Sequence, residues 1–371
     1  MASASIRLSR VFKKESWCKL FPLGVRQVQL FSSYLSERKS TSAHLVESPL
    51  HRILSHLPGQ MQMAFAYGSG VFQQEGHKDF SQNMIDFIIA VDDPVSWHRE
   101  NIKVNGKHYS FLKYFGPRYI NRVQSQYGAG VYFNTLVPCE GRLIKYGVIG
   151  TDKLEIDLLD WETLYVSGRL HKPVKMLKAP SKSSLIAALD INLKSAVHAA
   201  LLLLPDEFSE IDLYTTIAGL SYNGDFRMVI GEDRNKVSNI VRPNVERFRK
   251  LYENILDNEE HIFWNKSKGF LEQYPNHAVQ YHHLNLLPKM VQMNLVAVRN
   301  VSGRYYDTEE VIRSFAHSSQ CDEYVAKSIE EIVRKSSRSQ SIKTIFTAGL
   351  KKSIVYSCKK LKKMVKGSNK I

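Results

Sequence analysis

Two short apolar runs constrain the fold of this chain more than any other feature. Met63–Tyr67 stops at the turn residues Gly68–Gly70, and Met84–Val91 carries a single aspartate, Asp86, in its middle. Apolar runs of this length that end at turn residues are typical of buried strands. Because a carboxylate is costly to bury without compensation, Asp86 needs a cation or hydrogen-bond donors beside it. The pattern predicts a buried sheet that carries a charged site.

The residues that follow predict an α/β fold with several strands close in sequence. Val131–Val137 and Arg142–Ile149 have the pattern of two strands joined by a turn. Leu154–Leu159 has the pattern of a third strand, and it contains a second acidic candidate, Asp157. Between these strands, Phe111–Gln126 is expected to form a helix.

A change of character at Pro180 predicts a boundary between one domain at residues 46–180 and another at residues 181–335. Beyond this proline, Ser183–Leu204 has leucines on one helical face, and a short strand is expected at Phe226–Ile230. Helices accompanied by a small β element are typical of a winged-helix or purely helical domain. Further helices are predicted at Asp206–Leu220, Val245–Leu256 and Thr308–Val333.

Positive charge is concentrated at the two ends of this 371-residue chain, whose net charge is +15. Residues 1–45 have a net charge of +6, residues 332–371 have +12, and the residues between them have −3. The first segment is rich in Arg, Lys and Ser and lacks a long apolar block, which is typical of a mitochondrial presequence. The last, taken as residues 336–371, predicts a basic amphipathic helix. Such a helix suits an anionic membrane surface, packing on the body of the protein, or RNA phosphates.

Gly68, Ser69, Asp86 and Asp157 together predict a site for a nucleotide. The backbone amides and the hydroxyl of a Gly-Ser turn can hold terminal phosphates, because glycine permits close approach. Two aspartates from separate strands can hold Mg²⁺, which prefers carboxylate and phosphate oxygens. The arrangement resembles that of polymerase-β type nucleotidyltransferases. Asp86 lacks an acidic partner two positions away, which leaves the number of metal ions open.

Uncommon strings occur in a fixed order along the chain. They are F-A-Y-G-S-G-V-F at Phe65–Phe72, M-I-D-F at Met84–Phe87, Y-G-A-G-V-Y-F at Tyr127–Phe133, I-K-Y-G-V at Ile144–Val148, L-Y-V-S-G-R-L-H-K-P-V at Leu164–Val174, G-D-F-R-M at Gly224–Met228 and F-T-A-G at Phe346–Gly349. Together they resemble the mitochondrial CDP-diacylglycerol synthase family, whose members are also called phosphatidate cytidylyltransferases or translocator assembly and maintenance proteins. The resemblance runs from about Leu54 to Lys363.

The resemblance implies an enzyme that converts CTP and phosphatidate to CDP-diacylglycerol and pyrophosphate with Mg²⁺, for cardiolipin and phosphatidylglycerol synthesis. It also implies a nucleotidyltransferase domain, a winged-helix domain and a C-terminal amphipathic helix that binds the membrane. Such an enzyme would be peripheral to the matrix side of the mitochondrial inner membrane. Carried over residue by residue, Gly68 and Ser69 hold the triphosphate, and Asp86 and Asp157 hold the metal and are catalytic.

Two phosphorylated substrates also require fixed cations, because their negative charges repel each other. Lys145, Arg169 and Lys172 are the candidates for contacts with the phosphates. His98 and Asn101 are candidates for the nucleotide pocket, although a structural role for His98 is equally open. The remaining histidines lack the spacing of a metal site.

Two other functions remain open at this point. One is a non-catalytic membrane factor on the matrix side that supports protein import. The other is an RNA-directed nucleotidyltransferase that uses the basic tail on nucleic acid. The uneven charge disfavours the second function, because nucleic-acid binders more often spread positive charge over their folded surface. No nucleic-acid partner is therefore expected.

Overall fold

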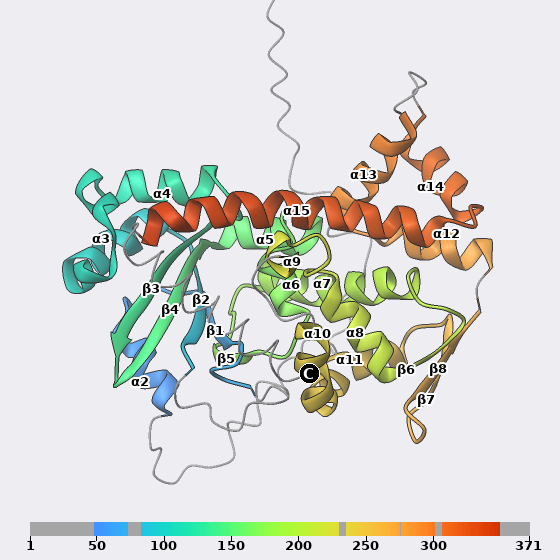
Figure 1. Ribbon diagram of the computed structural model, residues 1–371, viewed down its shortest axis with the longest axis horizontal. Helices are drawn as coiled ribbons and strands as arrows, with labels where there is room; N and C mark the ends of the chain where they lie inside the picture. The colour runs from blue at the N-terminus through green and yellow to red at the C-terminus, as the bar shows by residue number, and fades with distance from the viewer. Residues whose placement is uncertain (1–47, 73–82, 230–234, 275, 301–305, 349–371) are drawn as a thin grey trace, which may run out of the picture. The chain divides into compact units, whose positions relative to one another are not determined.

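The computed structural model describes residues 48–72, 83–229, 235–274, 276–300 and 306–348, which belong to one folded unit (Figure 1). The predicted presequence at residues 1–45 lies outside the described residues, as does the basic tail after residue 348.

A five-stranded sheet organises the first half of this unit, with the strand order β3-β4-β2-β1-β5. Strands β2 and β4 are parallel, and the other neighbouring pairs are antiparallel. The four strands predicted up to residue 150 are confirmed. The elements are α2 (Pro49–Ser55), β1 (Met63–Tyr67), β2 (Ile85–Val91), α3 (Pro94–Asn105), η2 (Gly106–His108), η3 (Phe111–Phe115), α4 (Pro117–Gln126), β3 (Val131–Cys139), β4 (Arg142–Gly150), α5 (Thr151–Asp160), α6 (Ser167–Leu170) and β5 (Lys175–Lys178).

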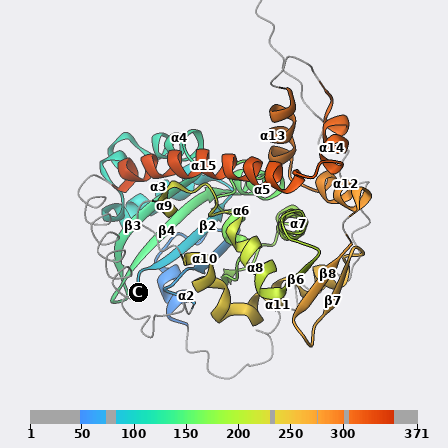
Figure 2. The same cartoon turned by 45° about the vertical axis from the view of Figure 1, so that its right-hand side comes forward.

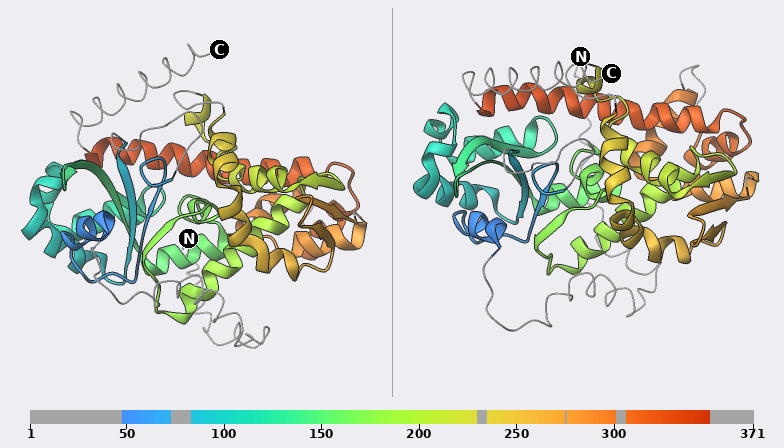
Figure 3. Two further views of the ribbon diagram at one scale, coloured as in Figure 1. Left: turned by 90° about the horizontal axis from the view of Figure 1, so that it is seen from below. Right: turned by 60° about the horizontal axis from the view of Figure 1, so that its bottom comes forward.

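The two faces of this sheet are covered by different helices. One face packs against α2 and α3, whose Ile53 and Trp97 join alternate strand residues such as Phe87 and Tyr146 in an apolar core. The other face carries the residues between them, including Asp86, and contacts α5. Figure 3 shows α3 and α4 in teal on one side of the sheet and the green helices that follow β4 on the other.

Two predicted strands are helices instead. Leu154–Leu159 lies within α5, where Leu154 and Leu158 are buried one turn apart against the sheet. An apolar pair at this spacing suits a helix face, so the strand prediction is wrong. Phe226–Ile230 was also expected as a strand, but Phe226–Val229 forms the short helix α9.

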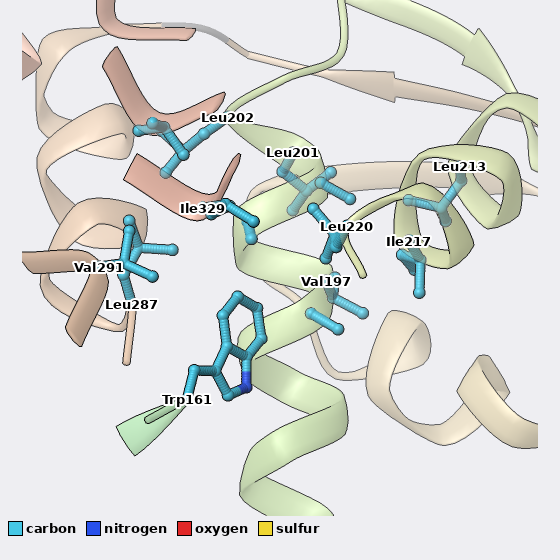
Figure 4. Packing of buried hydrophobic residues seen from close by; sticks show 14 of the residues in the cluster. Trp161, Val197, Leu201, Leu202, Leu213, Ile217, Leu220, Leu287, Val291 and Ile329 are labelled. Atoms are coloured by element: carbon cyan, nitrogen blue, oxygen red, sulfur yellow. The ribbon is translucent and has the colours of Figure 1, made fainter. Parts of the chain in front are cut away.

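The second half of the unit is a helical assembly with a small antiparallel sheet of order β6-β8-β7 (Figure 2). Its core surrounds α7 and includes Trp161, Val197 and Ile329 (Figure 4). Helix α7 is long and apolar enough to cross a membrane, but 67% of it is buried inside the protein. The elements are α7 (Ser183–Leu201), β6 (Glu207–Ser209), α8 (Glu210–Gly219), α9 (Phe226–Val229), α10 (Lys236–Val241), η4 (Arg242–Asn244), α11 (Val245–Asp257), β7 (Ile262–Asn265), β8 (Phe270–Gln273), α12 (His277–Asn285), α13 (Lys289–Arg299), α14 (Thr308–Ala316) and α15 (Cys321–Ala348).

Helix α15 joins the two halves (Figure 1). It packs on α13 in the helical half and on β3 in the sheet half. Near its end, the Gln340 amide accepts a hydrogen bond from the Ala129 N–H at 2.9 Å, and buried Lys343 donates to the Gln124 carbonyl at 3.1 Å. The predicted boundary between residues 335 and 336 therefore falls inside one continuous helix. The first part of the expected tail packs on the folded body.

Candidate active site

Three laterally paired residues form the centre of the site, namely Tyr67 on β1, Asp86 on β2 and Lys145 on β4. Paired residues of neighbouring strands share a face, so these side chains lie in one row. The Lys145 Nζ lies 3.5 Å from the Asp86 Oδ1, and the two side chains are 13% and 24% exposed. Lys145 Nζ also lies 4.3 Å from the ring centroid of Phe133 on β3. Lys145 is therefore the cation that a carboxylate in an apolar strand requires.

The Gly68–Gly70 turn leaves β1 directly beside Asp86. Gly68 has a φ of +82°, and a Cβ added there would lie 3.5 Å from Oδ2 of Asp86. A Cβ at Gly70 would lie only 2.6 Å from the Met84 carbonyl oxygen, so this backbone packs tightly on the start of β2. The Ser69 carbonyl accepts a hydrogen bond from the Asn83 amide at 3.2 Å. The structure thus brings the predicted turn and the predicted aspartate together.

Two arginines add positive charge to this row. The Cζ of Arg169, on α6, lies 5.3 Å from the ring centroid of Tyr67 and 3.9 Å from that of Tyr165. Arg227, on α9, forms a salt bridge with the buried carboxylate of Asp225 and is close enough to act electrostatically on Arg169 and Tyr165. Each arginine comes from a different half of the unit, so the site lies where the sheet half meets the helical half.

The pKa of Tyr165 reports the positive potential of the site. Burial alone would raise the pKa of this phenol, but Arg169, Lys145 and Arg227 outweigh burial and lower it. At Tyr67 burial prevails, and the pKa is raised despite Arg169 and Lys145. A protein surface with several cations around one carboxylate attracts polyanions such as a nucleoside triphosphate.

Lys172 connects the two halves beneath this site. Its Nζ donates a hydrogen bond to the Ser221 hydroxyl at 2.8 Å and another to the Gly168 carbonyl. Burial, and then the charge of Arg169, lower the pKa of Lys172 to about 7. Contact between Lys172 and a substrate phosphate remains a prediction, because this ammonium group already serves the packing of α6 on the loop before α9.

Asp157 lies in a different environment from the one expected. It lies on α5 with a relative exposure of only 2%. Its two carboxylate oxygens accept five hydrogen bonds, from the N–H and hydroxyl of Thr163, the N–H of Val166, and the N–H and hydroxyl of Ser167. A carboxylate offers about four lone-pair positions, so these donors saturate it. In the structure these bonds fix the loop that carries Tyr165, and the metal and catalytic role of Asp157 stays a prediction without structural support.

His98 and Asn101 lie on the opposite face of the sheet from Asp86. Both are fully buried on α3, and Asn101 donates hydrogen bonds of 2.9 Å to the hydroxyls of Tyr109 and Tyr146. The two ring nitrogens of His98 lie 2.8 Å from the Tyr109 hydroxyl and the Gln124 amide oxygen. Tyr146 follows Lys145 on β4 and so points to the other face. The structure places His98 and Asn101 in the core on this face, away from the row of Asp86, so their place in a nucleotide pocket stays a prediction without structural support.

Sequence reasoning missed Arg227 and Tyr165 as site residues. Both lie in strings that carried the family resemblance, G-D-F-R-M and L-Y-V-S-G-R, but no spacing rule connects them to Asp86. Gly224, in the same string as Arg227, packs closely on α15. A Cβ added there would lie 2.4 Å from the Glu330 carbonyl oxygen. The close packing of this glycine on α15 helps to place Arg227.

Comparisons with known proteins point to a single family. A family model described as "Phosphatidate cytidylyltransferase, mitochondrial" matches residues 50–363. The chain is 53% identical to a Xenopus laevis protein and 52% identical to a Bos taurus protein over 317 residues, covering 85% of this chain and 94% of each relative. It is 41% identical to a Caenorhabditis elegans protein over 316 residues, covering 98% of that relative. All three relatives are named "Phosphatidate cytidylyltransferase, mitochondrial".

Proposed function

Because this chain belongs to the mitochondrial phosphatidate cytidylyltransferase family, we propose that the site around Asp86 transfers a cytidylyl group from CTP to phosphatidate. The products are CDP-diacylglycerol and pyrophosphate. The observation that carries this assignment to the site is the row of Tyr67, Asp86 and Lys145 beside the Gly68–Gly70 turn. The row supplies one partly exposed carboxylate and adjoining cations, which suit a triphosphate.

The reaction needs charge neutralisation more than it needs a base. The phosphate oxygen of phosphatidate attacks the α-phosphorus of CTP, and the bond to pyrophosphate breaks. A phosphomonoester has a second pKa of about 6, so it is already largely ionised at neutral pH. The residues therefore have to align two anions and offset their repulsion. In this proposal Lys145, Arg169 and Arg227 supply the fixed positive charge, and Gly68 and Ser69 bind the terminal phosphates.

Mg²⁺ fits this site through a single protein carboxylate. Magnesium is commonly held by one or two carboxylates together with substrate phosphates. Asp86 is partly exposed and faces the turn, whereas the oxygens of Asp157 are already used. We assign the ion to Asp86 and the phosphates of CTP, where it would offset the negative charge of the phosphates.

The topology supports the finer fold assignments. Strand β1, the Gly-Ser turn and β2 with its aspartate have the order of a polymerase-β-like nucleotidyltransferase. In the helical half, the order α7, β6, α8, α11, β7 and β8, with β6 paired to β8, is that of a winged helix. On this proposal the wing is the β7–β8 hairpin rather than residues 226–230.

We further propose that the protein is peripheral to the matrix side of the mitochondrial inner membrane. The last turns of α15 contact the end of α4, and η3 lies next to α4 in sequence and space. Large apolar side chains are exposed on these neighbouring elements, and they are Phe111, Tyr114, Phe115, Ile342, Ile345 and Phe346. Together with the lysines of residues 349–371 they suit an anionic bilayer surface.

One experiment tests the activity against its alternatives. The protein without residues 1–45 is incubated with labelled CTP and either phosphatidate vesicles or RNA, with and without Mg²⁺. We expect Mg²⁺-dependent label in lipid and pyrophosphate release. Label only in RNA would identify an RNA-directed enzyme, and transfer to neither acceptor would support a non-catalytic membrane factor.

A separate truncation tests the membrane contact. A chain that ends at Ala348 keeps the described helix and its packing but loses the basic residues that follow. We expect weaker sedimentation with cardiolipin-containing vesicles and slower turnover of phosphatidate in bilayers. Unchanged sedimentation would remove residues 349–371 from the proposed surface.

A further inference from the structure

A cluster of four histidines and one glutamate lies in the helical half, apart from the proposed catalytic residues. His198 comes from the last turns of α7, Glu259 and His261 from the segment between α11 and β7, and His282 and His283 from α12. The rings contact one another, with centroids 5.2 Å apart for His198 and His283 and 4.9 Å apart for His261 and His282. Three segments that are distant in sequence thus bring potential metal ligands together.

The spacing of the ligand atoms suits one tetrahedral ion. The Nδ1 atoms of His198 and His283 lie 3.1 Å apart, and the His198 Nδ1 lies 3.7 Å from the Glu259 Oε2. Two ligands about 2.0–2.1 Å from a tetrahedral zinc ion lie roughly 3.3 Å from each other. Ligand atoms of His198, Glu259 and His283 all lie within 4.8 Å of one another, and those of Glu259, His261 and His282 form a second such group.

One ring nitrogen of this cluster has no hydrogen-bond partner in the described part of the chain. The Nε2 of His283 is buried and has no hydrogen-bond partner among the described residues. Buried polar groups are normally paired, and either ring nitrogen of a histidine can bind a metal ion, so this nitrogen is available as a ligand.

We propose that His198, Glu259 and His283 bind one divalent ion of the zinc class, with His261 or His282 completing its coordination. Imidazole nitrogens with one carboxylate favour zinc over magnesium, which prefers oxygen ligands alone. The ion would connect the end of α7, the segment before β7, and α12. It therefore acts as a structural crosslink of the helical half, separate in chemistry and location from the magnesium proposed at Asp86.

Cobalt provides a direct test, because tetrahedral Co²⁺ absorbs visible light strongly and occupies zinc sites. The full chain, without an affinity tag, is freed of metal with a chelator and titrated with Co²⁺. We expect a visible band that saturates near one equivalent, disappears when Zn²⁺ is added, and persists in Asp86→Asn. We also expect Zn²⁺ to raise the melting temperature of the metal-free protein. Absence of both the band and the melting shift in the wild-type protein would overturn the proposal without reference to any variant.

Matched variants locate the ion. His283→Gln and Glu259→Gln are expected to lose the cobalt band and the zinc-dependent rise in melting temperature. His277→Gln changes a histidine of the same helix that lies against His317 instead, and it is expected to keep both signals. A band of wild-type intensity in His283→Gln would also overturn the proposal, because the ion would then be bound elsewhere.

Discussion

The two faces of the five-stranded sheet carry polar groups of opposite kinds. On one face, Asp86 and Lys145 are charged, partly exposed and close to further cations. On the other, Asn101 and Tyr146 are fully buried in a neutral hydrogen-bond network, where burial lowers the pKa of His98 to about 4. Neighbouring strand residues point to opposite faces, so one position separates Lys145 from Tyr146. Exposure and charged neighbours, rather than residue type, distinguish the face that we propose to bind substrate from the polar core.

The largest loss of activity is expected from Asp86→Asn, which changes the charged face. The substitution removes the one carboxylate of the charged row, and we expect kcat/KM for cytidylyl transfer to fall by at least about 100-fold. The melting temperature should fall modestly, because Lys145 loses its ion-pair partner while the shape of the side chain is retained. Steady-state assays with thermal melts measure both quantities. A variant that keeps wild-type activity would remove the catalytic role from this face.

The adjacent pair Lys145→Met and Tyr146→Phe compares the two faces directly. Lys145→Met is expected to reduce kcat/KM by about 10- to 100-fold, because a fixed positive charge near the phosphates is lost. Tyr146→Phe removes the hydroxyl that accepts from Asn101, so we expect the free energy of unfolding to fall by about 1–2 kcal/mol at unchanged kcat/KM. Urea unfolding and kinetics on both variants test the contrast. Equal kinetic losses would mean that the faces are not functionally distinct.

Asp157→Asn tests whether the Asp157 carboxylate supports the fold or takes part in catalysis. The amide would place its NH₂ group against N–H and hydroxyl donors of Thr163 and Ser167. We expect the free energy of unfolding to fall by about 2 kcal/mol, with a smaller loss of activity as the loop that carries Tyr165 loosens. If the variant were as stable as wild type yet as inactive as Asp86→Asn, the metal role of Asp157 would be restored.

Local patterns predicted much of the sheet but only part of the site. The strand with Asp86 and the adjoining turn follow from apolar runs and glycine, which are short-range signals. The sequence L-E-I-D-L-L fits both a strand period and a helix period, and we assigned Asp157 to a strand. The helical period prevails in the structure, where Leu154 and Leu158 are both buried one turn apart. Lys145 was proposed as a phosphate contact, but its ion pair with Asp86 depends on strand register, which the sequence did not reveal.

Contacts between distant segments were also not predicted, because the sequence shows only short-range patterns. Arg227 reaches the site only because α9 packs on α15 and brings Arg227 within electrostatic range of Arg169, and no local spacing encodes that arrangement. The histidine cluster lacks metal-site spacing along the chain, because its ligands come from α7, α12 and the segment between α11 and β7. Likewise, the basic amphipathic pattern after residue 336 did not reveal that Gln340 and Lys343 pack on the sheet half.

The smallest effect on activity is expected at the edge of the sheet, where Lys343 is a buried counterpart to Lys145. Burial lowers the pKa of Lys343 to about 7, from 10.5 for a free side chain. Between these values the unfolded chain binds the proton and the folded protein does not, so this group makes stability rise with pH. Lys343→Met lacks that dependence. We therefore expect the unfolding free energy of wild type, minus that of the variant, to increase from pH 7 to 9.5 in urea titrations. A flat difference would mean that Lys343 keeps its charge in the fold, and the contrast between a charged site lysine and a neutral packing lysine would fail.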